Sequence, residues 1–342
     1  MKAYRIWFSC VLSLTLSLFF GWTNTMFVCL LPMLMLSRLV RWNSVMFAQM
    51  VLAVFWVGIE TNVILGFLQP YPLLMSIAVA IMLLSKCYAM QHKASSLFGT
   101  IGLLFGSVII NIGSYPGVDL ENFTVGFWQA SWVAVVVCAL AFYIFPEPIA
   151  ENEPVELEVR EATSEQLWQQ TVLGWLVAMV IFFIFQIAHL NDSLSAQASM
   201  LIILSPMTLV GSLQAAKIRV MGTLYGCLAA LLIQLGLSAW YDNIVLFVLA
   251  YAIAAALFSH WLAGDAVRVG IGFSAMSALI VPLTSSLVPG QQDAVYAIFY
   301  RLSSILCAVA ITSLLIWLVH RGLQRARWRR GSQDELDIVN VP

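Results

Sequence analysis

Long apolar runs separated by short polar segments repeat along the whole chain. Most of these runs are long enough to cross a bilayer core, which needs about 20 apolar residues in a helix. The pattern predicts an all-α polytopic membrane protein with about 12 transmembrane helices. The expected spans are residues 5–22, 25–40, 44–66, 71–90, 94–114, 123–146, 167–188, 194–213, 217–240, 243–262, 267–287 and 294–319.

Composition points the same way. Of 342 residues, 61% are hydrophobic and 10% are charged, whereas a soluble domain carries roughly 25% charged residues. All six cysteines lie in or beside apolar segments without C-x-x-C spacing, which predicts neither a disulfide framework nor a metal site. The sequence contains no phosphate-binding G-x-x-x-x-G-K-[ST] loop and no hydrolase motif. We therefore expect no enzyme, no cofactor and no nucleic-acid binding.

Basic residues indicate the orientation in the membrane, because cytoplasmic loops are enriched in Lys and Arg. With twelve spans and both termini in the cytoplasm, the expected outer loops contain no basic residue, and Arg301 lies inside the last span. The other basic residues then fall on the cytoplasmic side: Lys2, Arg5, Arg38, Arg41, Lys86, Lys93, Arg160, Lys217, Arg219, Arg268, Arg321, Arg325, Arg327, Arg329 and Arg330.

The spans divide into two halves that resemble each other. Residues 1–146 and 167–320 would each form a six-helix membrane repeat, joined by an acidic cytoplasmic linker at 147–166 and followed by a cytoplasmic tail at 321–342. Pro32 aligns with Pro206, and "FWQAS" aligns with "FYRLS", which places Gln129 opposite Arg301. Because six is an even number, the repeats would be parallel and related by an axis along the membrane normal.

Arg301 is the first candidate functional residue. It lies about 10 Å below the outer end of the last span, at 1.5 Å per residue. A charge at that depth usually faces a cavity or a partner. It would bind or gate an anion in the cavity between the halves; alternatively it snorkels outward or forms a structural pair with Asp293.

Three further polar residues are candidates for the same cavity. Glu60, near the end of the third span, would carry protons or pair with Arg301; the alternative is a position in interfacial water. Asn111 and Ser285 lie in glycine- and serine-rich spans. Such spans pack closely, and these two side chains would line the cavity.

The ninth expected span begins "KIRVMGTLYGCLAALL". Arg219, Gly222, Thr223 and Gly226 resemble the R-x-x-G-T-x-x-G run of the fusaric acid resistance superfamily, which includes the aromatic acid exporters. From the residues alone, Arg219 would anchor the cytoplasmic end of the span, and the two glycines would form a packing face. Many members carry a large cytoplasmic domain that this chain lacks, so it resembles a compact branch.

The resemblance implies a bacterial inner-membrane transporter subunit that exports aromatic or other organic acids. It also implies a periplasmic membrane-fusion partner of the HlyD type, and a homo-oligomer is compatible with it. Because the chain has no motif for ATP hydrolysis, transport would need an ion gradient or a separate motor protein. An anion channel or facilitator, and a membrane scaffold without a solute path, are the alternatives.

Overall fold

The computed structural model describes residues 1–22, 24–115, 118–146, 164–188, 194–237, 243–285 and 294–339, which form twelve helices and no strand. The first half contains α1 (Lys2–Phe19), α2 (Thr25–Arg38), α3 (Ser44–Leu68), α4 (Pro72–Gln91), α5 (Ser96–Gly113) and α6 (Leu120–Ile144). The second half contains α7 (Ser164–Ile187), α8 (Leu194–Leu204), α9 (Leu209–Gly236), α10 (Ile244–Leu262), α11 (Ala266–Ser285) and α12 (Ala294–Val339).

Nine of these helices are long and apolar enough to cross a membrane, and α2 and α8 are shorter apolar helices. Large apolar side chains cover much of the outer surface; Leu73 is 81% exposed and Val210 is 77% exposed. In water such a surface would drive aggregation, whereas lipid solvates it. The chain is therefore a polytopic, all-helical membrane protein, as the apolar pattern predicts.

Several helices begin at side chains that cap their free N–H groups. Asn43 before α3 and Asn243 before α10 each accept bonds from the backbone N–H groups two and three residues later. Asp119 caps α6, and Thr208 caps α9. These polar residues therefore set helix starts within an otherwise apolar sequence.

The expected spans 194–213 and 217–240 are wrong at their shared boundary. Helix α8 ends at Leu204, residues 205–208 break the chain direction, and α9 already begins at Leu209. Pro206 lies in the break, and Met207 beside it has a left-handed backbone with φ 49°. Proline cannot continue the hydrogen-bond ladder, so the helix stops earlier than the apolar run. In α2, by contrast, Pro32 is accommodated inside the helix.

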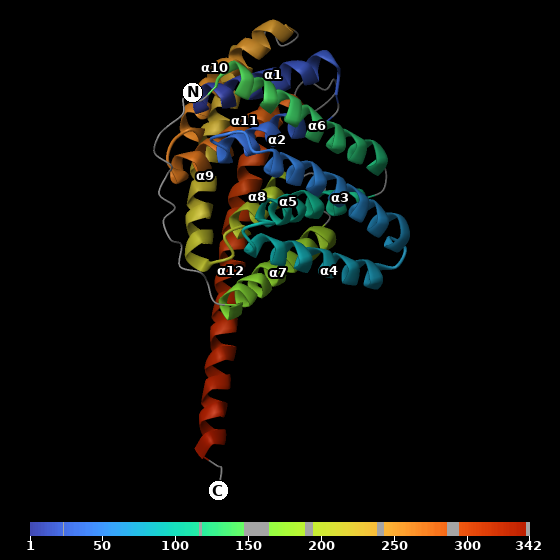
Figure 1. Ribbon diagram of the computed structural model, residues 1–342, viewed down its shortest axis with the longest axis vertical. Helices are drawn as coiled ribbons and strands as arrows, with labels where there is room; N and C mark the ends of the chain where they lie inside the picture. The colour runs from blue at the N-terminus through green and yellow to red at the C-terminus, as the bar shows by residue number, and fades with distance from the viewer. Residues whose placement is uncertain are drawn as a thin grey trace.

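The last helix extends further than the expected span 294–319. Helix α12 continues to Val339 and extends well beyond the other helices in Figure 1. The expected tail at 321–342 is therefore largely continuous with α12. The expected linker at 147–166 overlaps α7 from Ser164, and its residues 147–163 lie outside the described part of the chain.

The two halves pack by the same helix pairs. In the first half the pairs are α1–α2, α3–α5, α4–α5, α2–α6, α3–α6, α1–α6 and α3–α4. Adding six to both helix numbers gives the corresponding pair in the second half. These pairs are α7–α8, α9–α11, α10–α11, α8–α12, α9–α12, α7–α12 and α9–α10. Contacts between the halves follow the same rule, because α1–α10 matches α4–α7 and α2–α11 matches α5–α8.

The interface between the halves runs through the middle of the molecule. In Figure 1, α1 and α10 lie together at one end of this interface, α4 and α7 lie at the other, and α2, α11, α5 and α8 lie between them. Both apolar clusters of the core contain side chains from both halves. The halves therefore form one packed body with a seam of paired helices.

Candidate functional site

A cavity of about 310 Å³ lies in this seam. Helices α2, α4 and α5 of the first half and α8, α9 and α11 of the second half line it, together with the break that follows α8. Most lining side chains are apolar, including Leu104, Phe105, Leu201, Ile218 and Phe273. We call this space the seam cavity.

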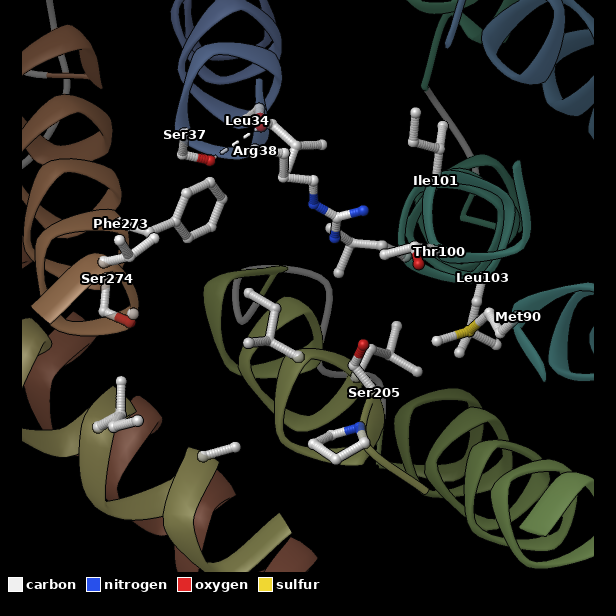
Figure 2. Close-up of a pocket in the computed structure, with 18 of the residues that line it drawn as sticks. Leu34, Ser37, Arg38, Met90, Thr100, Ile101, Leu103, Ser205, Phe273 and Ser274 are labelled. Atoms are coloured by element: carbon white, nitrogen blue, oxygen red, sulfur yellow. Dashed lines mark hydrogen bonds between the residues drawn. The ribbon is translucent and has the colours of Figure 1, made fainter. Parts of the chain in front are cut away.

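Arg38 is the only charged side chain that lines the seam cavity among the described residues. Figure 2 shows its guanidinium projecting from α2 into the open space, towards Thr100 on α5. It has no hydrogen-bond or ion-pair partner in the described part of the chain. The nearby Ser37 hydroxyl donates instead to the Leu34 carbonyl, at 2.9 Å. The seam cavity thus offers an apolar wall and one available cation.

Arg38 is not among the site residues predicted from the sequence, because it lies near the cytoplasmic end of the expected span 25–40, where basic residues are common. In the structure it is the last residue of α2. Basic residues are common at the last turn of a helix, where they interact with the helix dipole, so its position gives no sign of a special role. The role of Arg38 becomes visible only in the structure, where the short helix α2 lies beside α5 and α11 and these helices line the seam cavity.

Two further arginines lie close together within the second half. Arg219 of α9 is 2% exposed and Arg301 of α12 is 8% exposed. The Nη1 of Arg219 donates to the Ser277 hydroxyl at 3.0 Å, and the Nη2 of Arg301 donates to the Ser277 carbonyl at 3.3 Å. The Nε of Arg219 donates to the Ser199 hydroxyl of α8 at 3.0 Å. Four helices therefore converge on this arginine pair.

Arg219 does not anchor the end of a span, contrary to the expectation. Helix α9 begins ten residues before it, and its side chain is buried against α8 and α11. Arg301 is likewise held inside the second half and does not project into the seam cavity. Arg219 lies in the interior of α9 because that helix begins at Leu209, directly after the Pro206 break.

Small residues explain how both guanidinium groups reach the same serine. A Cβ at Gly222 would lie 2.5 Å from the Ile271 carbonyl oxygen, and one at Gly226 would collide with the Ala275 carbonyl. Thr223 between them is fully buried. The missing side chains let α9 lie directly on the backbone of α11, which brings Arg219 to Ser277.

Glu60 pairs with a lysine of its own half. Its carboxylate lies 2.6 Å from the Nζ of Lys86 on α4, which is 2% exposed. The ammonium also lies 4.9 Å from the centre of the Phe98 ring. The expected pairing of Glu60 with Arg301 is therefore wrong. Lys86 lies within α4, inside the expected span 71–90, and its side chain is buried.

Asn111 joins the two halves. Its amide donates to Gln197 of α8 at 3.1 Å, and Gln197 donates to the Ser107 carbonyl at 3.0 Å. Gln186 of α7 donates to the Ser114 hydroxyl at 2.7 Å. Asn111 and Gln197 are fully buried, so this network cross-links the seam and does not line the seam cavity.

The remaining sequence candidates do not join these groups. The side chain of Gln129 is exposed on α6, so it does not occupy a position equivalent to the buried Arg301. Ser285 ends α11, and nothing is described of its side chain; Asp293 lies outside the described residues. Within the described residues no group of His, Cys, Asp or Glu side chains is placed to hold a metal ion.

These features define a multi-pass membrane protein with a mostly apolar cavity between two helical halves. Residues 169–315 match the family described as fusaric acid resistance protein-like, and residues 2–141 match the family described as a protein of unknown function, DUF2955. The second half of the chain is therefore fusaric acid resistance-like, and the resemblance inferred from Arg219 to Gly226 is confirmed. No curated protein and no solved structure matches the chain.

Proposed function

We propose that the protein is a bacterial inner-membrane transporter subunit that exports aromatic or other organic acids through the seam cavity. The unpartnered guanidinium of Arg38 in an otherwise mostly apolar cavity carries this proposal. A planar guanidinium binds carboxylates well, and an apolar wall suits an aromatic body. Transport fits the fusaric acid resistance-like match of the second half.

The membrane potential supplies a driving force for such export. With the cytoplasm negative, outward movement of a monoanion is favoured by about 2.3 kcal/mol per 100 mV. An acid that enters the seam cavity from the cytoplasm therefore needs no ATP-hydrolysing motif in the chain. Arg38 supplies the initial attraction at the cytoplasmic ends of α2, α5 and α11 in the orientation proposed below.

The orientation and the partner belong to the same proposal. We infer two parallel six-helix repeats with both termini in the cytoplasm, supported by the recurring helix pairs and by the absence of basic residues from the expected outer loops. A cysteine at Asn243 should then react with an impermeant reagent added outside. An HlyD-type fusion protein is the partner implied by the resemblance, and it should co-purify in mild detergent.

Removal of the Arg38 charge tests the proposal. Arg38→Gln is expected to lower benzoate export from preloaded cells or proteoliposomes at least about tenfold, as for loss of a charge-assisted hydrogen bond. Arg38→Lys keeps the charge but loses the planar guanidinium, which can donate two parallel hydrogen bonds to a carboxylate. This variant should therefore retain part of the flux. Lys217→Gln is the matched control, because Lys217 is an exposed cation of α9 next to the cavity-lining Ile218.

The outcomes separate the alternatives. Saturable export that depends on Arg38 and increases with an inside-negative potential supports a transporter. Flux that rises linearly with benzoate concentration indicates a channel. Normal export by a correctly inserted Arg38→Gln variant contradicts the assigned site, and no flux in any preparation favours a scaffold. The seam cavity argues against the scaffold, since a scaffold interface is expected to be filled by side chains.

A further inference from the structure

The arginine pair of α9 and α12 lies apart from the seam cavity and carries two like charges. Both guanidinium groups bind Ser277, so they repel each other in a low-dielectric interior. Neither has an acidic partner among the described residues; the acceptors of their hydrogen bonds are serine oxygens. Two buried cations without a counter-charge are costly.

Donors of the pair also lack acceptors. The Nε of Arg301 is enclosed by protein and has no hydrogen-bond partner among the described residues. The hydroxyl of Thr223, one turn after Arg219 on α9, is likewise enclosed and without a partner in that part of the chain. Buried polar groups are normally satisfied, so these donors call for an acceptor, and the two positive charges favour one that is negative.

The arginine pair lies one turn of α11 away from the lining of the seam cavity. Ser274 lines the seam cavity, and Ser277, one turn further along α11, donates its hydroxyl to the Ser274 carbonyl at 2.9 Å. On α9, the cavity-lining Ile218 directly precedes Arg219. In the proposed orientation, this direction along α11 leads from the cytoplasm towards the outer surface.

We propose that Arg219 and Arg301 form a second anion site, which takes the carboxylate of the exported acid after it leaves Arg38. This inference rests on the proposed function. The guanidinium groups supply the charge and N–H donors that a carboxylate accepts, and the Thr223 hydroxyl adds another donor. An anion between them cancels the repulsion, so occupancy stabilises the second half.

The test uses the full-length protein in detergent, with methanesulfonate as the only other anion. Sodium acetate is the probe, because it offers a carboxylate without an aromatic body, and the readout is the apparent Tm. The wild type is expected to show a saturable rise in Tm. In Arg301→Gln the half-saturating acetate concentration should increase at least about tenfold, as for loss of a charge-assisted hydrogen bond.

A matched control and a second variant keep the test decisive. Arg321→Gln removes an exposed cation from the same helix and should respond like the wild type. Arg301→Lys keeps the charge; it should bind acetate more weakly than the wild type and decides the question if Arg301→Gln does not fold.

Three results would overturn the site: no acetate response, an equal response in the Arg301 variants, or an equal effect of sodium chloride, which would indicate anion binding without selectivity for carboxylates. An Arg301-dependent acetate response without any benzoate export would leave this site standing and remove the proposed transport function. Export that depends on Arg38 without an acetate response would support the proposed transport function and remove the second anion site.

Discussion

The two halves of the molecule share their helix pairs, but the charged groups of Lys86 in the first half and of Arg219 and Arg301 in the second half are held in different ways. In the first half, the ammonium of Lys86 is neutralised by Glu60 at 2.6 Å and covered by the Phe98 ring. In the second half, Arg219 and Arg301 are held on Ser277 without an acid among the described residues. The first half thus contains a closed ion pair, and the second half retains two positive charges.

This difference indicates that the two halves interact differently with an anion. The Glu60–Lys86 ion pair has no net charge, so it does not attract an anion. Two unneutralised guanidinium groups create a positive potential that favours an anion. The halves also match different families, DUF2955 and the fusaric acid resistance-like family. We infer that the shared packing is the scaffold on which the second half carries the proposed second anion site.

The largest expected effect comes from opening the closed ion pair. Glu60→Gln leaves Lys86 buried and unpaired, and it should lower the free energy of unfolding by about 3 kcal/mol. This is the lower end of the range for a broken buried pair, because Glu60 is 22% exposed. The measurement is the unfolding midpoint in mixed detergent micelles titrated with denaturing detergent.

Two companion variants sharpen the comparison. Glu60→Gln combined with Lys86→Met should return to within about 1 kcal/mol of the wild type, because it removes the orphaned charge. Arg301→Gln should destabilise less than Glu60→Gln, because it removes one of two repelling charges. Equal losses for Glu60→Gln and Arg301→Gln would show that the two halves do not differ in the proposed way.

The sequence predicts the membrane class and most helix positions, because lipid imposes a length and an apolar composition on each helix. The end of α8 was misplaced, since an apolar run does not reveal that Pro206 breaks the backbone in one half while Pro32 does not in the other. That single misplacement moved Arg219 from the middle of α9 to a helix end. Its burial therefore escaped the sequence analysis.

The candidate site could be predicted only in part. Arg301 stands out because it is a charge within an apolar run. Arg38 and Lys86 do not, because a basic residue near the end of a run looks like an ordinary cytoplasmic anchor. Their roles depend on which helices lie beside them: α5 and α11 beside Arg38, and α3 beside Lys86. Tertiary packing, which single-sequence patterns do not encode, decides between anchor, ion pair and binding group.

A smaller effect is expected from the glycines that set helix contacts, and it again separates the halves. Gly226→Ala should lower the free energy of unfolding by about 2 kcal/mol. Its Cβ would meet the Ala275 carbonyl and lie 2.8 Å from the Cβ of Ala278, so α9 and α11 must separate. The same movement pulls Arg219 away from Ser277, so the acetate response of the arginine pair should weaken as well.

Gly58→Ala changes a close contact of α3, the first-half counterpart of α9, and should cost less. The new Cβ would meet the side chains of Trp128 and Thr124 on α6, and side chains can rotate away where a backbone carbonyl cannot. Gly236→Ala, at the end of α9 with open space around it, should be neutral or slightly stabilising because alanine favours helix. If Gly58→Ala proves as costly as Gly226→Ala, or if Gly226→Ala leaves acetate binding unchanged, close α9–α11 packing is not what positions the arginine pair.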